Sequence, residues 1–487
     1  MNSNLKVLYL AAEAEPLVKV GGLGDVSGSL PAALQATGEV DVRLVIPFYG
    51  IIQELPLQLQ MVASFDIPHL AGPIRAQVFT TRLNELVVYL VSGNPIPPDA
   101  PVYSADPSQD GHKFTFFSLA ALELARALNW APDILHANDW HTAPALYKLR
   151  LQRDPFFDNT TTAFGLHNLP YMGVGTGKAM DAFGLPPAAA SVLPWWAKDI
   201  PLPLGLWAAD HIVAPSPTYA HEILTPEFGL GLEKFLKTRS PRITGILNGI
   251  DTRKWNPETD PFIPLNYTQD TFDNRAMNKQ SLLAELDLDP DLQLPLIGII
   301  SRLDAQKGID LVPSAFQHLT DQPWQAVILA SGDPILEASL HQLELDFPGK
   351  VRSVIRYDAM LSHRIYAAAD ILLIPSRYEP CGLTQMIAMR YGCIPVARAT
   401  GGLQDTIQDY GVSDNSTGFL FKKPNASELG HAIHEALHVY REPQRWFDLQ
   451  QRSMSQDFSW EKSARQYINL YRLLVERKMG KRKVSRN

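Results

Sequence analysis

Short apolar runs alternate with stretches of helical periodicity from one end of the chain to the other. The apolar runs predict buried strands at Val7–Leu10, Val42–Ile46, Leu86–Val91, Asp133–His136, Ala163–Leu166, Ile212–Ala214, Leu296–Ile300, Ala326–Ala330, Ile371–Ile374 and Ile394–Ala397. Strands that alternate with helices in this way are typical of parallel sheets built from βαβ units. The pattern therefore predicts an α/β protein.

A Pro-containing stretch, Asp251 to Asn274, interrupts this alternation and has little helical period, so it predicts an interdomain crossing. The chain has 487 residues, which exceeds one ordinary hydrophobic core. We therefore expect two doubly wound, Rossmann-like domains, residues 1–246 and 247–458. The C-terminal segment 459–487 carries an apolar helical face that must pack on one of them, and we expect it to return to the first.

Composition removes several classes of protein. Hydrophobic residues make up 46% and the net charge is −8, a globular balance that argues against a nucleic-acid partner. No apolar run is long enough to span a membrane, and the first ten residues lack a signal-peptide pattern. The two cysteines do not form a disulfide framework, and no Cys/His cluster has zinc spacing. We expect a cytoplasmic protein without a metal or a membrane partner.

The most specific chemistry follows the predicted strand Ile371–Ile374. Glu379 stands at the carboxyl end of that strand, where open α/β sheets bind ligands. Pro380 is expected at the first position of a helix, whose free N–H groups favour anions. The segment thus offers an acceptor for sugar hydroxyls, Glu379, beside a phosphate cradle, Gly382–Thr384. Taken alone, it is equally consistent with an ordinary turn whose Glu caps a helix.

Two further motifs predict contacts with phosphate. The glycine-rich segment Lys19–Asp25 follows the first strand and precedes a helix, although a plain tight turn has the same pattern. Arg302 and Lys307 follow the first strand of the second half. Two fixed cations there would stabilise the charge that develops on a departing nucleoside diphosphate. The alternative is a pair of surface cations on a loop.

Two motifs predict contacts with a sugar. Asp139 and Trp140 are adjacent after a strand: the carboxylate accepts hydroxyl bonds, and the indole covers an apolar sugar face. A core Trp140 beside a helix-capping His141 is the alternative. His167 follows the next strand. A lone histidine is more often structural than catalytic, so His167 is a candidate only because of the other motif residues expected near it. The glycine turns at Asn248 and Thr400 are weak signals.

Together these motifs carry a family resemblance. The blocks that begin at Lys19, His136, Asn248, Ser301 and Glu379 resemble, in order, those of the bacterial glycogen synthase and plant starch synthase family. The resemblance implies the GT-B fold, in which two Rossmann-like domains face a central cleft. It also implies a retaining glycosyltransferase that moves glucose from ADP-glucose to the non-reducing end of an α-1,4-glucan, as in glycogen or starch biosynthesis.

The resemblance also implies roles for single residues. Catalytic roles fall to Lys19, His167, Arg302, Lys307 and Glu379. Donor binding is implied for Lys19, Gly21, Gly22, Asp25, Asp139, Asn168, Asn248, Arg302, Lys307, Tyr357, Cys381, Gly382, Leu383 and Thr384. Acceptor binding is implied for Trp140 and Tyr103. The expected partners are ADP-glucose and a glucan, and no cofactor or metal is implied.

Two positions depart from the pattern. Ile387 stands where the wider superfamily often has a second acid, and Asn138 stands where the family often has His. Without a second carboxylate, we expect a front-face path in which the departing phosphate accepts the acceptor's proton. A donor that contacts both domains would require the cleft to close. The alternatives are a transferase with another nucleotide sugar and a small acceptor, and an inactive glucan-binding protein.

Overall fold

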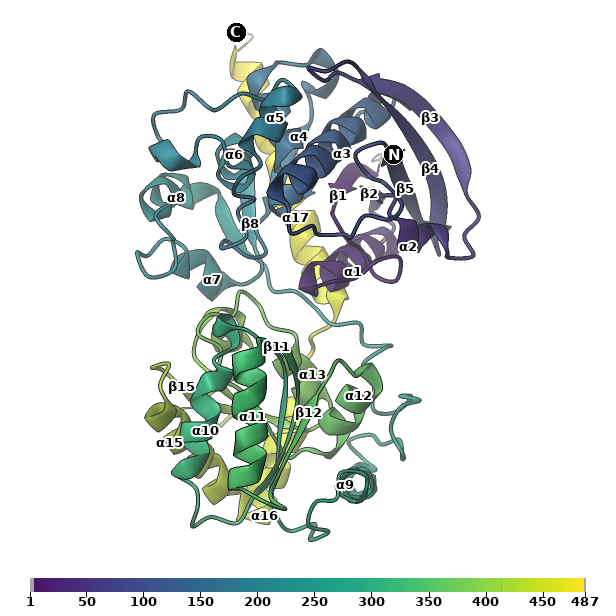
Figure 1. The fold of residues 1–487 in the computed structure, drawn as a ribbon. Helices are drawn as coiled ribbons and strands as arrows, with labels where there is room; N and C mark the ends of the chain where they lie inside the picture. Colours follow the sequence, from purple (N-terminus) through teal and green to yellow (C-terminus); the bar gives the residue numbers. More distant parts are fainter. Residues whose placement is uncertain (1–3, 413, 486–487) are drawn as a thin grey trace. The chain divides into compact units, whose positions relative to one another are not determined.

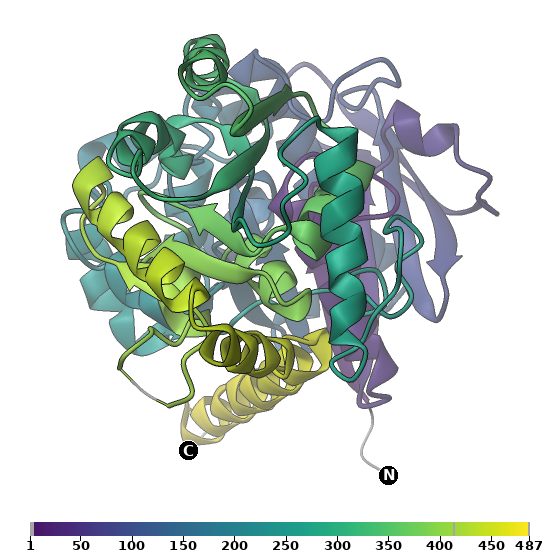
Figure 2. The same cartoon turned by 90° about the horizontal axis from the view of Figure 1, so that it is seen from below.

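The computed structural model describes residues 4–412 and 414–485 (Figures 1 and 2). The chain divides into two compact units. Unit 1 comprises Met1–Gly249 and Trp460–Asn487, and unit 2 comprises Ile250–Ser459. The Pro-containing stretch after Asp251 therefore belongs to unit 2. There the carboxylate of Asp260 is buried and accepts hydrogen bonds from the Tyr391 hydroxyl and the His363 ring, each at 2.6 Å.

Unit 1 is built on one large sheet. Its strands are β1 (Leu5–Leu10), β2 (Val40–Pro47), β3 (Gln60–Ile67), β4 (Ile74–Leu83), β5 (Leu86–Gly93), β6 (Ile134–Asn138), β7 (Thr161–Gly165), β8 (His211–Ala214) and β9 (Ile243–Gly245). Their order in the sheet is β3-β4-β5-β2-β1-β6-β7-β8-β9. All neighbours run parallel except β3-β4 and β4-β5. The strand order therefore reverses direction between β1 and β6.

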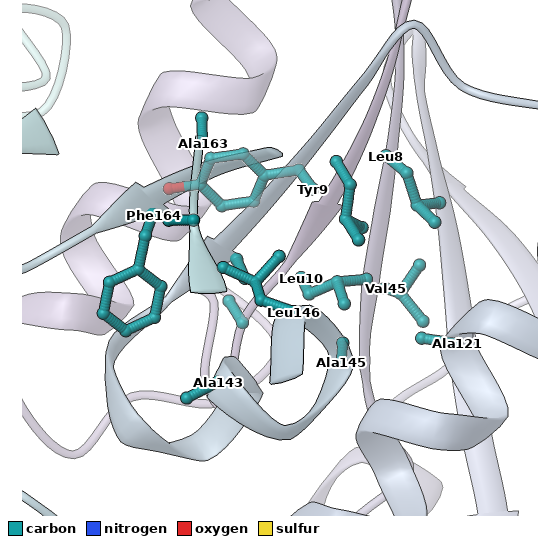
Figure 3. Close-up of a cluster of buried hydrophobic side chains, with 14 of the residues drawn as sticks. Leu8, Tyr9, Leu10, Val45, Ala121, Ala143, Ala145, Leu146, Ala163 and Phe164 are labelled. Carbon is teal, nitrogen blue, oxygen red and sulfur yellow. The ribbon is translucent and has the colours of Figure 1, made fainter. Parts of the chain in front are cut away.

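Helices cover both faces of this sheet. They are α1 (Gly22–Ala36), α2 (Gly50–Gln53), α3 (Pro107–Ala127), α4 (Asp139–Leu151), α5 (Gly177–Ala182), α6 (Pro201–Ala208), α7 (Pro217–Glu222), α8 (Glu233–Arg239) and α17 (Trp460–Ser485). Helices α3, α4 and α6 pack in one group and α1 packs with α17. Figure 3 shows part of the core beneath them, with Leu8, Tyr9 and Leu10 of β1, Val45 of β2, and Ala143, Ala145 and Leu146 of α4.

The C-terminal helix α17 belongs to unit 1, as expected, and lies beside α1 (Figure 1). Its apolar face buries Ala464, Tyr467 and Tyr471 in the core of unit 1. The Tyr471 hydroxyl lies 2.6 Å from Nδ1 of His136 on β6. The last element of the chain therefore completes a core formed by the first half.

Unit 2 is a smaller, wholly parallel version of the same design. Its strands are β10 (Leu296–Leu303), β11 (Gln325–Gly332), β12 (Val351–Ile355), β13 (Ile371–Ile374), β14 (Ile394–Arg398) and β15 (Phe419–Phe421). They are ordered β12-β11-β10-β13-β14-β15. Here the strand order reverses between β10 and β13, because the chain first adds strands on one side of β10 and then on the other.

The helices of unit 2 also form two groups. They are α9 (Arg275–Glu285), α10 (Val312–Gln317), α11 (Pro334–Asp346), α12 (Ala359–Ala368), α13 (Thr384–Arg390), α14 (Gly401–Thr406), α15 (Ala426–Tyr440) and α16 (Pro443–Met454). Figure 1 shows α10 and α11 on one side of the sheet and α12 and α13 on the other. Helix α15 packs on α10, and Figure 2 shows it followed directly by α16. Both units are thus doubly wound α/β folds.

Every strand predicted from an apolar run is present in the structure. The strand-like segment Val351–Ile355 forms β12, whereas the sequence did not predict the antiparallel pair β3 and β4, nor the short strands β9 and β15. β3 is largely exposed, so it lacks the continuous apolar run of a buried strand. Within the residues that the structure describes, no helix is long and apolar enough to cross a membrane.

Replacing Tyr471 tests how strongly α17 stabilises unit 1. Tyr471→Ala removes a fully buried ring and is expected to cost about 3–5 kcal/mol of unfolding free energy for unit 1. Tyr471→Phe keeps the ring and loses only the bond to His136, about 1 kcal/mol. Urea unfolding measures both. Leu473→Ala, on the exposed face of the same helix, is the control with a loss within about 0.5 kcal/mol. Equal losses for the two alanine variants would contradict this packing.

Candidate active site

The predicted site residues of unit 1 gather where its strand order reverses. Ligands bind at the carboxyl ends of the strands at such a switch point. Lys19 lies in the connection that follows β1, Asp139 follows β6 directly, and His167 lies two residues beyond β7. Because β1, β6 and β7 are neighbours in the sheet, three segments that are far apart in the sequence emerge side by side.

The glycine-rich loop after β1 is held by Glu13, a residue that sequence reasoning missed. Glu13 is buried, and its Oε2 accepts hydrogen bonds from the backbone N–H groups of Val20 at 2.5 Å and Gly21 at 3.0 Å. Its other oxygen accepts a bond from the Tyr103 hydroxyl at 2.7 Å. A Cβ on Gly24 would lie 3.0 Å from Oε2, so a small residue is needed there. The carboxylate therefore sets the conformation of the loop that leads into α1.

Lys19 is placed among carboxylates. Its Nζ lies 2.6 Å from Oδ1 of Asp25, in the first turn of α1, and 3.5 Å from Oε2 of Glu15. Burial raises the pKa of Asp25 to about 6, and Lys19 opposes that shift. The predicted residues Lys19 and Asp25 are thus brought together with Gly21 and Gly22. An anionic ligand that approached Lys19 would compete with Asp25 for its ammonium group.

Asp139 adopts a left-handed backbone conformation, with φ of 52°, at the junction of β6 and α4. Its Oδ1 accepts a hydrogen bond from the backbone N–H of His167 at 2.8 Å. Burial raises the pKa of Asp139 to about 7, while the N–H groups of His167 and Asn168 act in the opposite direction. The carboxylate therefore links the end of β6 to the loop after β7. The backbone of Asp139 lies in the left-handed region, which only Asn, Asp and Gly adopt readily.

His167 and Asn168 each present an unsatisfied polar atom. Nε2 of His167 lies 2.8 Å from Oδ1 of Asn138. Nδ1 of His167 and Oδ1 of Asn168 are buried and have no hydrogen-bond partner in the described part of the chain. Burial lowers the pKa of His167 to about 4, so its ring is neutral at pH 7. Buried polar atoms without partners are uncommon in native proteins, and satisfying these two takes two donors, such as two separate hydroxyls of a ligand.

The aromatic residues expected to bind the acceptor form a cluster. Trp140 is half-buried and packs edge-on against Phe114, with ring centroids 5.1 Å apart. Tyr103 packs against Phe114 and against His141. Burial, and to a lesser extent Lys113, lowers the pKa of His141 to about 3. Both predicted acceptor residues therefore take part in the packing of unit 1, and their contact with an acceptor stays a prediction.

Asn248 lies at the end of the first segment of unit 1, three residues beyond β9. The residue is buried, and its Oδ1 has no hydrogen-bond partner in the part of the chain that the structure describes. Its side-chain oxygen can therefore accept a hydrogen bond, and its contact with the nucleotide sugar stays a prediction.

In unit 2 the predicted residues again gather at the switch point, here between β10 and β13. Lys307 follows β10 and Glu379 follows β13, and the Lys307 ammonium lies 2.7 Å from Oε2 of Glu379. The Ser376 hydroxyl donates to the same oxygen at 2.9 Å. Gly308, with φ of 65°, lets the chain turn directly after Lys307. The structure therefore joins two residues that are 72 positions apart, and it adds Ser376, to which the sequence had given no role.

Arg302 and Tyr357 are more exposed. The Arg302 side chain is 61% exposed, and its guanidinium lies 3.5 Å from a carboxylate oxygen of Asp304. Tyr357 follows β12 and is 85% exposed. Side chains so accessible can reorient toward a ligand at little cost, but their predicted contacts with the donor stay predictions.

The expectation that Pro380 opens a helix is wrong. Helix α13 begins at Thr384, because Gly382 is left-handed, with φ of 74°, and a helix cannot run through it. The segment from Glu379 to Cys381 packs instead against Gly401 and Gly402, the first residues of helix α14, and the N–H of Gly402 donates to the Glu379 carbonyl at 3.0 Å. A Cβ on Gly401 would lie 1.9 Å from that carbonyl oxygen. Gly382 and Leu383 therefore form the bend that leads into α13.

Among the described residues, no group of three or more His, Cys, Asp or Glu side chains is arranged to hold a metal ion. Cys381 and Cys393 are both buried in unit 2, and neither takes part in a disulfide. Among the predicted site residues, Lys19, Arg302 and Lys307 carry positive charge.

Comparisons with known proteins agree with this geometry. Residues 6–238 match the family described as starch synthase catalytic domain, and residues 287–448 match glycosyl transferases group 1. A glycogen synthase from Thermodesulfovibrio yellowstonii is 37% identical over 98% of this chain and all of its own length. Glycogen synthase 2 from Nitrosococcus oceani is 39% identical over 98% of each chain.

Comparison with solved structures also finds a starch synthase catalytic domain. The catalytic domain of starch synthase IV from Arabidopsis thaliana, bound to ADP and acarbose, superimposes with a TM-score of 0.88 and 34% identity, covering 97% of this chain and all of that one. Sucrose-phosphate synthase from Thermosynechococcus elongatus, with a TM-score of 0.60 and 19% identity, shares the fold alone, over 97% of this chain and 99% of its own. The expected GT-B fold class is confirmed.

Asp139 gives a prediction about pH. Its folded-state pKa of about 7 exceeds its usual value of 3.8. Between those values the folded state binds more protons than the unfolded state, so unfolding free energy falls as pH rises. Asp139→Asn keeps an acceptor oxygen, suits the positive φ and removes the titration. The melting temperature of this variant, relative to the wild type, should therefore be higher at about pH 8 than at about pH 5.

The control for this prediction is Asp66→Asn, which changes a half-exposed carboxylate paired with Arg75. Its melting temperature relative to the wild type should change little between the same two pH values. A pH-independent difference for Asp139→Asn would show that the pKa of Asp139 is not raised.

Proposed function

This chain belongs to the glycogen synthase and starch synthase family, and we propose that it transfers glucose from ADP-glucose to the non-reducing end of an α-1,4-glucan. As a family member it is a retaining glucosyltransferase. The observation that carries the choice of donor is the likeness, over 97% of this chain, to a starch synthase catalytic domain bound to ADP. The two switch-point sites supply side chains that suit both parts of such a donor.

Unit 1 suits the glucosyl part of the donor. Asp139, His167 and Asn168 present hydrogen-bonding atoms in buried surroundings where His167 is neutral. Buried hydrogen-bonding groups suit the neutral hydroxyls of a sugar. A charged ligand would have to lose its strong hydration in order to enter the same surroundings. In this proposal Asp139 and Asn168 accept hydroxyl bonds, and His167 lies beside the anomeric carbon.

Unit 2 suits the diphosphate. Arg302 and Lys307 stabilise the negative charge that grows on the phosphate oxygen as the bond to C1 breaks. They thereby supply the positive charge that a metal ion provides in many enzymes that act on diphosphates, so the proposal includes no metal or other cofactor. Glu379 holds glucose hydroxyls, and Ser376 and Lys307 fix its orientation. Tyr357 is proposed as a platform for adenine.

The reaction breaks the bond between C1 and the phosphate oxygen and forms a bond from C1 to the acceptor hydroxyl oxygen on the same face. The hydroxyl proton passes to the departing phosphate oxygen, which leaves as ADP. No step needs a protein nucleophile. Asp139 already binds backbone N–H groups, and Glu379 is paired with Lys307. The protein therefore acts by orientation and by electrostatic stabilisation.

Replacement of Glu379 tests the unit 2 site. Glu379→Ala leaves sugar hydroxyls and the Lys307 ammonium without their carboxylate, so kcat should fall on the order of a hundredfold or more. Steady-state release of ADP measures the effect. Glu285→Ala, which breaks an exposed ion pair with Arg364 in the same unit, is the matched control and should leave kcat unchanged. Near-normal turnover in Glu379→Ala would remove this residue from the site.

A donor competition tests the function itself. Purified protein is given ADP-glucose or UDP-glucose, each with and without glycogen, and release of the nucleotide is followed. We expect rapid release from ADP-glucose only when glycogen is present, and release at least about tenfold slower from UDP-glucose. The added glucose should be removed by β-amylase, which cleaves α-1,4 bonds from non-reducing ends.

Each other outcome of this experiment has a defined meaning. Equal turnover of the two donors would refute the choice of ADP-glucose. Rapid turnover with a small acceptor but not with glycogen would favour the alternative transferase. Glycogen binding without turnover would favour an inactive glucan-binding protein.

A further inference from the structure

Three neighbouring strands of unit 1 end beside one another, at Leu10 of β1, Asn138 of β6 and Gly165 of β7. In the parallel register Leu10 pairs with Ala137, the residue before Asn138, and Asn138 pairs with Gly165. The Asn138 side chain therefore lies between the end of β1 and the loop that carries His167. It is buried, and it belongs to none of the donor or acceptor contacts proposed above.

The hydrogen bonds of Asn138 fix the direction of its amide. Nδ2 lies 2.8 Å from the backbone carbonyl oxygen of Leu10. A carbonyl oxygen only accepts, so the NH₂ group must face Leu10 and Oδ1 must face away from it. Oδ1 in turn lies 2.8 Å from Nε2 of His167 and 3.2 Å from the hydroxyl of Tyr9.

This orientation determines where the proton of His167 resides. An amide oxygen cannot donate, so Nε2 of His167 must carry the hydrogen of their 2.8 Å bond. A neutral imidazole has only one such hydrogen, which leaves Nδ1 with a lone pair. Nδ1 is buried and, within the residues that the structure describes, has no hydrogen-bond partner. The unsatisfied atom is therefore an acceptor and not a donor.

Gly165 leaves room for this contact. A Cβ built on Gly165 would lie 2.4 Å from Oδ1 of Asn138 and 2.9 Å from Nε2 of His167, so any side chain there would force the two atoms apart. Nε2 of His136 would lie 3.1 Å from the same Cβ. Two independent features, the Leu10 carbonyl and the absence of a side chain at position 165, thus support a single arrangement of Asn138 and His167.

We propose that Asn138 is a positioning residue that fixes His167 as the Nε2–H tautomer, so that Nδ1 accepts a hydrogen bond from a hydroxyl of the bound sugar. The role of the sugar rests on the proposed function. The tautomer rests on the hydrogen bonds of Asn138 and on the neutrality of the buried ring, and not on the identity of the ligand. A ring fixed in this way selects a ligand group that donates, such as a hydroxyl, and rejects one that only accepts, such as a carbonyl or carboxylate oxygen.

The test combines nitrogen-15 NMR of labelled histidine side chains with kinetics on the full chain. A protonated and an unprotonated imidazole nitrogen have widely separated shifts, so the tautomer is read directly, and His167→Ala identifies the signal. We expect the wild-type ring to show Nε2–H. In Asn138→Leu, which keeps the shape but removes the acceptor, the Nδ1–H form should appear. The same variant should lower kcat/KM for the donor by more than about tenfold.

Two further variants separate positioning from folding. Asn138→Asp keeps an acceptor for Nε2–H, so it should retain the tautomer and turn over faster than Asn138→Leu. It also keeps the test informative if the leucine variant does not fold. Tyr9→Phe removes the other bond to Oδ1 and should leave the His167 signal unchanged.

Three results would overturn the proposal. The first is a wild-type ring that carries its proton on Nδ1. The second is an unchanged tautomer in Asn138→Leu. The third is a changed tautomer in that variant with normal kinetics. A wild-type protein without glucosyl transfer would refute the proposed function instead, and the NMR result would still decide the tautomer.

Discussion

The sites of this protein depend on the point at which each sheet reverses its strand order. In unit 1 the reversal lies between β1 and β6, and in unit 2 it lies between β10 and β13. At such a point the connections from two adjacent strands depart to opposite faces of the sheet and leave the strand ends uncovered. The glycine-rich loop and Asp139 occupy one such edge, and Lys307 and Glu379 occupy the other. The same topological rule thus places the predicted chemistry of both units.

Burial then gives the two sites different electrostatic characters. In unit 1, the pKa of Asp139 is raised to about 7 and that of His167 is lowered to about 4, because charge is costly in those surroundings. In unit 2, Arg302 is well exposed and Lys307 is paired with Glu379. In the proposed function, the groups of low charge in unit 1 bind the neutral sugar, and the two cations of unit 2 bind the diphosphate.

Residues to which the sequence had given no binding or catalytic role set the geometry of the predicted site residues. Glu13 holds the glycine-rich loop through two backbone N–H groups, and Asn138 holds the ring of His167. Ser376 does the same for the Glu379 carboxylate. A hydrogen bond to a charged or buried partner restricts the partner's rotation as well as stabilising it. These positioning contacts therefore determine how precisely the reactive groups are arranged.

The sequence alone determined the α/β class, the presence of two doubly wound domains and most of the candidate residues. Apolar runs such as Ile371–Ile374 form buried strands because of their composition. Glu379 comes shortly after that run in the sequence, so it lies near the carboxyl end of the strand. Tertiary structure alone decided which strands are neighbours, that Lys307 meets Glu379, and that Glu13 serves the loop after β1. It also decided that helix α13 begins only at Thr384, because Gly382 adopts a left-handed conformation. Local patterns report burial and periodicity, whereas contacts between distant residues and pKa values arise from packing that no local pattern contains.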